Sequence, residues 1–333
     1  MPAERYSEKR LRDPFTVSLL FSEPFQFALP DFIAAIGEAF PALGEWSDMW
    51  GDQVFDTAQG VTGLLPRKDS QSGGSISFYS MPPGPLSRDG HYDLAISRAF
   101  AFKGAREAWN AHDSHLTFSY SSEGTDLASR FEAARLVTCV SAVLAADPTC
   151  VGVMFPSGDA FVSPDAWRQG AAEAILNRWP LMTWFSYEIN RFAPKAPGGR
   201  PEASCGAIGM AAFNGHEVAF AAAPVEPAYA VASVQSAMYL LLAGGNRFQD
   251  GDTIGVEGSE ERQRIRFKPE GPEAQTDCWI LLHPSSSIDE LAVFGERKTP
   301  PPPPGLENEI RPQEDYMDRL LGGHGGQDPA LKH

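Results

Sequence analysis

Residues 125–192 constrain the fold of this chain more than any other stretch, because they combine a long apolar helix with three further elements in direct succession. Within residues 125–146, apolar side chains recur three and four residues apart, which is the spacing of an α-helix. Thr125 or Asp126 can cap its first turn, and Asp147-Pro148 ends it, because a proline disfavours helical geometry in the residue before it. Apolar residues occupy more than one side of this helix, so we expect it to be buried between layers.

Three elements follow this helix. The sequence Cys-Val-Gly-Val-Met-Phe at residues 150–155 is an apolar run of strand length. Ser163-Pro164-Asp165 has the cap residue and the first-turn proline that begin a helix. Residues 181–192 have the length of one long strand, whose side chains alternate between two faces. We interpret these four elements as part of an α+β architecture.

The remaining elements are predicted from the same periodicities. Strands are expected at residues 15–21, 75–81, 115–120, 205–213, 217–222, 253–256, 263–267 and 278–282, and helices at 30–40, 103–112 and 229–243. Asn214-Gly215 is typical of a tight hairpin turn between two of these strands. We predict an α+β fold with an antiparallel or mixed sheet and helices packed mainly on one face. The first strand and helix weakly resemble the strand and helix within residues 150–176, so two similar halves are a possible arrangement of this fold.

The chain divides into three regions. We expect a solvated leader at residues 1–13, a single α+β globular unit at 14–297, and a proline-rich linker with a flexible tail at 298–333. A length of 333 residues is enough for a sizeable core. Residues 316–321 of the tail carry apolar side chains at helical spacing, so a docking peptide is the alternative to a flexible tail.

The charge and the cysteines limit the possible partners and the compartment. The net charge of −16 would repel a phosphate backbone, so we expect no nucleic-acid binding. No apolar run reaches the roughly 18 residues that span a bilayer, and the charged N-terminus lacks the apolar core of a secretory signal. The four cysteines are widely spaced, as expected for free thiols in a reduced compartment. These features predict a cytoplasmic protein of unknown oligomeric state.

The predicted strand at residues 181–192 carries the best candidate binding face. Trp184, Ser186, Glu188 and Asn190 alternate onto one side of it, with Trp167 and Arg191 expected near the rim. An aromatic ring beside convergent polar groups is typical of a binding pocket. The alternative is a sheet surface that faces solvent or is covered by a helix.

Two short motifs resemble metal sites. His112-Asp113-Ser114-His115 places two imidazoles and a carboxylate together, but a third ligand is needed, and a helix-terminal turn with exposed histidines is the simpler interpretation. Residues 250–261 match several positions of a calcium loop, but Ile254 offers no side-chain oxygen at the fifth position, which favours a tight turn. We predict no metal and no cofactor, because nucleotide-binding and nucleophile motifs are also absent from the sequence.

Three segments resemble the bacterial domain of unknown function 4261 family. They are the helix with Cys150-Val-Gly-Val-Met-Phe, the Pro180-Leu-Met-Thr-Trp-Phe segment, and the Gln249-Asp-Gly-Asp-Thr-Ile-Gly turn before Arg264-Ile-Arg-Phe. The resemblance is expected over residues 14–285. It implies a bacterial α+β protein, with no established activity and no catalytic residues to carry over.

Two classes of function remain. The first is an acidic protein that binds a basic protein partner, such as an immunity or adaptor protein of a bacterial secretion or toxin system; complementary charge would speed this association. The second is a hydrolase or transferase whose site joins Glu188 to His112 or His115. The sequence lacks catalytic motifs, which favours the first class.

Overall fold

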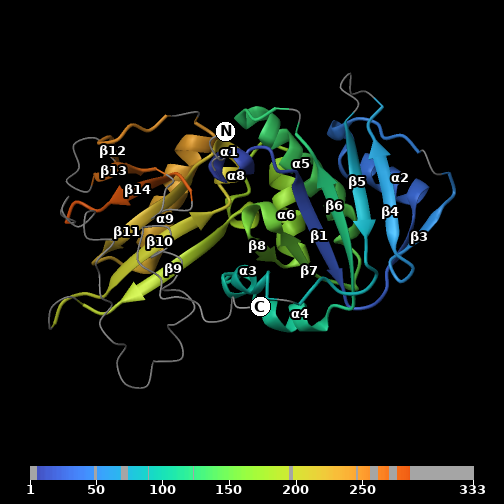
Figure 1. The fold of residues 1–333 in the computed structure, drawn as a ribbon, viewed down its shortest axis with the longest axis horizontal. Helices are drawn as coiled ribbons and strands as arrows, with labels where there is room; N and C mark the ends of the chain where they lie inside the picture. The colour runs from blue at the N-terminus through green and yellow to red at the C-terminus, as the bar shows by residue number, and fades with distance from the viewer. Residues whose placement is uncertain are drawn as a thin grey trace, which may run out of the picture. The chain divides into compact units, whose positions relative to one another are not determined.

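The computed structural model describes residues 6–48, 51–68, 74–88, 90–122, 124–194, 198–244, 247–255, 262–269 and 276–285. They belong to two compact units. Of these described residues, those within 12–186 form the N-terminal unit, and those up to residue 11 together with those from residue 187 onward form the C-terminal unit. Each unit contains a six-stranded sheet and its own helices (Figure 1). The predicted α+β class is confirmed.

The sheet of the N-terminal unit is antiparallel throughout its described pairs, in the order β4-β5-β6-β1-β7-β8. The strand β1 pairs on both sides, so that Leu19 lies opposite Leu116 of β6 and Val153 of β7. A separate two-stranded ribbon joins β2 to β3. The strands are β1 (Phe15–Phe21), β2 (Gln26–Ala28), β3 (Val54–Asp56), β4 (Val61–Pro66), β5 (Ser75–Ser80), β6 (Ser114–Tyr120), β7 (Cys150–Phe155) and β8 (Ala160–Val162).

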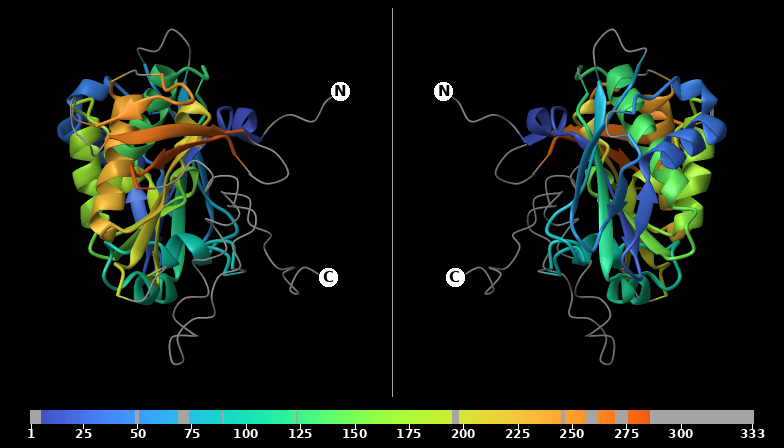
Figure 2. Two further views of the ribbon diagram at one scale, coloured as in Figure 1. Left: turned by 90° about the vertical axis from the view of Figure 1, so that its left-hand side faces the viewer. Right: turned by 90° about the vertical axis from the view of Figure 1, so that its right-hand side faces the viewer.

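The long helices of this unit share one face of its sheet. α5 (Leu127–Leu144) contacts β1 and β6, and both α2 (Leu29–Ala39) and α6 (Pro164–Ala174) pack against α5 (Figure 2). The short helices α3 (Asp93–Ser97) and α4 (Ala105–Ala111) cover the other face, where Trp109 packs with Leu20 and Met154. Because side chains alternate along a strand, Leu20 and Met154 point to this face of the sheet and their neighbours Leu19 and Phe155 point to the face covered by the long helices.

The helix starts predicted within residues 125–192 are confirmed, and the last strand predicted there needs a correction. The side chain of Asp126 accepts the N–H of Ser129 at 3.0 Å, and Ser163 Oγ accepts the N–H of Ala166 at 3.2 Å. The single strand predicted at residues 181–192 is wrong in its first part, which forms α7 (Leu181–Trp184) before β9 (Ser186–Phe192). The carbonyl of Pro180 accepts the N–H groups of Thr183 and Trp184 and so closes a helical turn.

The C-terminal unit has a mixed sheet in the order β12-β13-β14-β11-β10-β9, in which β11 and β14 run parallel. α9 (Pro227–Leu242) packs on β10 and β11 (Figure 2). In both units, three antiparallel strands that are consecutive in sequence lie beside a fourth strand, which is β1 in the N-terminal unit and β11 here. The pair that joins them is antiparallel in the N-terminal unit, where β6 meets β1, and parallel here, where β14 meets β11. The strands are β10 (Glu202–Ile208), β11 (Glu217–Ala223), β12 (Thr253–Ile254), β13 (Gln263–Lys268) and β14 (Cys278–Leu282).

The hairpin predicted around Asn214-Gly215 exists, but its two-residue turn is wrong. β10 and β11 pair antiparallel across a connection that contains α8 (Ala211–Asn214), and Gly215 ends this helix with a φ of 82°. Part of the expected leader forms α1 (Tyr6–Arg10), which contacts α8. The predicted tail, with its apolar residues 316–321, lies outside the described residues.

Candidate functional site

The two tryptophans of the predicted binding face lie in the core of the N-terminal unit. Trp184 ends α7 instead of lying on a strand, Trp167 lies on α6, and both side chains are fully buried. Trp167 Nε1 donates to Ser141 Oγ at 3.0 Å, and Trp184 Nε1 donates to Thr138 Oγ1 at 2.9 Å. These contacts join α6 and α7 to α5, which is a structural role; a role in binding stays a prediction.

Ser186, Glu188 and Asn190 share one face of β9, the outer strand of its sheet. They are buried, with exposed fractions of 5%, 1% and 4%. Ser186 Oγ and Asn190 Nδ2 form no hydrogen bond within the described part of the chain. Tyr187 lies on the opposite face, against α9, and Arg191 is exposed. The polar row is therefore enclosed rather than open to solvent, and ligand binding by it stays a prediction.

The imidazoles of His112 and His115 are buried where α4 meets β6, so the expected exposure of these rings is wrong. Leu86 N–H donates to His112 Nε2 at 3.1 Å, so the neutral ring carries its proton on Nδ1 and donates it to the carbonyl of Trp109. His115 Nδ1 lies 2.8 Å from the carbonyl oxygen of Gly84. Burial lowers the pKa of both imidazoles. Both rings thereby hold the loop that contains Gly84 and Leu86 against the junction of α4 and β6.

The Asp250 loop is a hydrogen-bonded turn. Asp250 Oδ1 accepts the N–H of Phe267 at 2.8 Å and lies 3.0 Å from Arg266 Nε, while Asp252 Oδ2 accepts the N–H of Gln249 at 2.7 Å. The expected twelfth calcium position, Glu261, lies outside the described residues. Among the residues that are described, no three His, Cys, Asp or Glu side chains are grouped to hold a metal ion.

Three buried cysteines and one buried glutamate lie away from these motifs, and their contacts indicate structural roles. Burial raises the pKa of Cys139, Cys150 and Cys205 to about 12, which keeps these thiols protonated. Glu217 is also buried, and its carboxylate accepts the N–H groups of Gly209 and Met210, each at 3.0 Å. Burial raises the pKa of Glu217 to about 7, although these N–H groups favour the charged form. Glu217 thereby holds the connection between β10 and β11.

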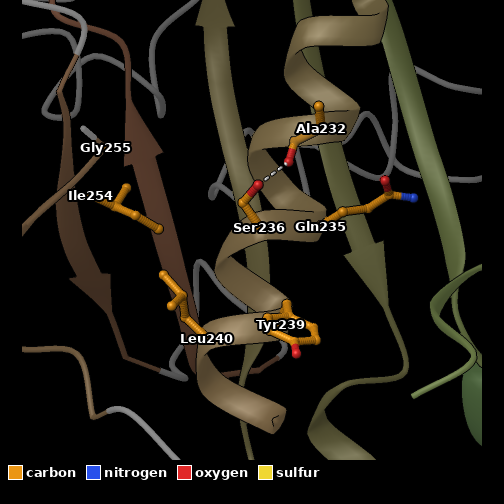
Figure 3. A pocket seen from close by; sticks show the side chains of 7 residues that line it. All are labelled: Ala232, Gln235, Ser236, Tyr239, Leu240, Ile254 and Gly255. Carbon is orange, nitrogen blue, oxygen red and sulfur yellow. Dashed lines mark hydrogen bonds between the residues drawn. The ribbon is translucent and has the colours of Figure 1, made fainter. Parts of the chain in front are cut away.

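A shallow groove of about 610 Å³ runs between α9 and β12 (Figure 3). α9 contains no charged residue, and the groove is lined by Ala232, Gln235, Ser236, Tyr239, Leu240, Ile254 and Gly255. Tyr239 is 60% exposed beside it. These groups suit contact with an uncharged surface and offer no carboxylate, imidazole or amine for acid–base chemistry.

No described helix is long and apolar enough to cross a bilayer.

One segment of the N-terminal unit is strongly acidic. Residues 14–66 contain seven acids and no Lys, Arg or His. The N–H of Leu29 donates to the carbonyl of Gln53, which ties the start of α2 to the segment before β3. Six of the acids lie on α2, on β3 or between them, and five of the six are exposed. We call these residues the acidic surface: Asp31, Glu38, Glu45, Asp48, Asp52 and Asp56. Whole-chain charge did not reveal it, but a charge count over a sliding window does.

The comparison with protein families matches one segment of the chain. Residues 207–281 match the family described as Domain of unknown function (DUF4261). This segment resembles that family. It runs from the end of β10 to β14 and includes α9, its groove and the Asp250 loop. Of the three segments expected to carry the resemblance, only the Gln249 turn with its following strand lies inside the match. No curated protein and no solved structure matches the chain.

Proposed function

We propose that this protein is a cytoplasmic acidic protein that binds a basic protein partner, as an immunity or adaptor protein of a bacterial secretion or toxin system would. The observation that carries the proposal is the segregation of charge: residues 14–66 contribute seven negative charges and no positive one to a net charge of −16. A field of one sign speeds the encounter with a partner of the opposite sign. The same field disfavours nucleic acid.

The acidic surface has carboxylates available for such a partner. Asp31, Glu38 and Asp52 are exposed and form no ion pair with any residue that the structure describes. Glu45 pairs with Lys68 at 3.2 Å, but both side chains are more than half exposed, so solvent weakens this pair and a partner can replace it. Val54 lies among the acids and is 59% exposed, which adds an apolar contact.

The hydrolase or transferase alternative receives less support from the geometry. Such an enzyme needs an imidazole able to exchange a proton with its substrate. His112 uses both ring nitrogens in contacts with backbone groups, and His115 Nδ1 contacts the backbone of Gly84. The protein-binding function therefore fits the described residues better.

Affinity capture from a lysate of the native host tests the proposal. At low ionic strength we expect one basic protein in stoichiometric amount. Salt near 1 M should release it, because the screening length falls from about 10 Å at 0.1 M to about 3 Å. Failure to retain any basic protein, together with a metal found by elemental analysis of the purified chain, would favour the enzyme instead.

A further inference from the structure

Residues 81–88 form a loop that is fastened to the corner between α4 and β6 by backbone and side-chain contacts. His112 Nε2 accepts the N–H of Leu86 at 3.1 Å, and His115 Nδ1 contacts the carbonyl of Gly84 at 2.8 Å. At the end of the loop, Arg88 donates to the carbonyl oxygens of His112 and Asn110, at 2.8 and 3.1 Å. Two buried imidazoles therefore hold the middle of the loop, and a guanidinium holds its end.

The hydrogen bond at His112 depends on the protonation state of its ring. A neutral imidazole has one donor and one acceptor nitrogen, whereas an imidazolium has two donors. Proton uptake on Nε2 would set a ring N–H against the N–H of Leu86. Since His112 is 1% exposed, the charged ring would also lack solvent around it. The loop and the charged form of His112 are therefore incompatible in this geometry.

We propose that residues 81–88 form an acid-released flap, in which protonation of His112 breaks the contact with Leu86 and opens the loop. Leu86 packs against the core cluster that contains Ile96 and Trp109. Opening of the flap uncovers this apolar cluster and the two imidazoles. The flap is a regulatory element that is separate from the proposed acidic surface.

The charged groups around the imidazoles oppose protonation. Arg88 on the flap and His115 on β6 both lower the pKa of His112, in addition to the larger effect of burial. Asp113, the residue that follows His112 in the chain, is exposed. Arg98, the residue that follows α3, forms an ion pair with Asp159. A group whose pKa is lower in the folded state stabilises the fold above its unfolded pKa, which is about 6.5 for histidine. This stability is lost as the pH falls from about 6.5 toward the folded pKa, so the flap is closed at neutral pH and opens in acid.

Amide hydrogen exchange of Leu86, measured by NMR on the full chain at pH 7.5 and pH 5 and corrected for the intrinsic rate, tests the flap. We expect its protection to fall at least tenfold at pH 5 while core amides of β1 stay protected. His112→Gln keeps an acceptor for Leu86 but cannot titrate, so its protection should be equal at both pH values. His91→Gln, which removes an exposed histidine of the same unit, should behave like the wild type.

Equal protection of Leu86 at both pH values in the wild type would overturn the proposal, as would a His112→Gln variant that keeps the acid-induced loss. Should that variant fail to fold, the ring nitrogens of wild-type His112 provide the answer. We expect the Nδ1-protonated neutral tautomer at pH 7.5 and loss of the Leu86 contact in step with its titration. A tautomer protonated on Nε2 would contradict the flap.

Discussion

Thr138 and Ser141 lie one turn apart on α5, and each accepts the indole N–H of a tryptophan from another helix. Trp184 donates to Thr138, and Trp167 donates to Ser141, which itself donates to the carbonyl of Val137 at 2.6 Å. All these groups are buried. A buried donor that loses its acceptor costs the free energy of desolvating it. At the scale of residues, single hydroxyl groups therefore specify how α6 and α7 pack on α5.

Replacement of Thr138 by Val keeps the shape of the side chain and removes the acceptor of the Trp184 N–H. We expect the free energy of unfolding to fall by about 1–3 kcal/mol, the usual cost of an unsatisfied buried donor. Urea denaturation followed by circular dichroism measures it. Thr62→Val, at an exposed position of β4, is the matched control and should change stability by less than about 0.5 kcal/mol. Equal stability of the two variants would contradict the structural role of this bond.

At the scale of elements, a glycine sets the distance between α6 and α7. A Cβ on Gly170 would lie 2.7 Å from Thr183 Cγ2 and 2.9 Å from Thr183 Oγ1. Thr183 is itself buried, so it has little room to move. Gly37 of α2, in contrast, has open space where a Cβ would stand. A side chain at residue 170 is therefore excluded on α6 by its contact with α7, whereas α2 has room for one at Gly37.

Alanine at these two positions should have opposite effects. Gly37→Ala should stabilise the protein by about 0.5–1 kcal/mol, because alanine favours helix over glycine. Gly170→Ala should destabilise it, because overpacking costs about 1–3 kcal/mol and exceeds the same helix gain. Thermal unfolding of both variants beside the wild type measures the difference. A rise in melting temperature for both would show that α6 and α7 are not closely packed.

Local signals predicted elements well where the residues that decide them are neighbours in sequence. The caps at Asp126 and Ser163 are examples. The turn at Asn214-Gly215 was wrong because Glu217 reaches back to the N–H groups of Gly209 and Met210, and no short pattern shows such a contact. Alternation placed Ser186, Glu188 and Asn190 on one face, but their burial depends on neighbours that are distant in sequence.

At the scale of the whole molecule, the uneven distribution of charge is the property that the proposed function uses. Seven acids without a base in residues 14–66 give one region of the N-terminal unit a strong negative field. Charged residues at an interface affect association mainly through this field. Position should therefore matter beyond total charge: removal of acids from the acidic surface should weaken binding more than removal of the same number elsewhere.

Titration calorimetry with the captured basic partner tests this claim most directly. The surface variant carries Asp31→Asn, Glu38→Gln and Asp52→Asn, and the control carries Glu8→Gln, Glu107→Gln and Glu226→Gln, which are exposed acids elsewhere in the chain. Each substitution removes one negative charge, so three substitutions change the net charge from −16 to −13 in both variants. We expect the surface variant to bind at least tenfold more weakly at low salt, and the control to stay within about threefold of the wild type, since tenfold corresponds to about 1.4 kcal/mol. Equal affinities of the two variants would contradict binding through the acidic surface.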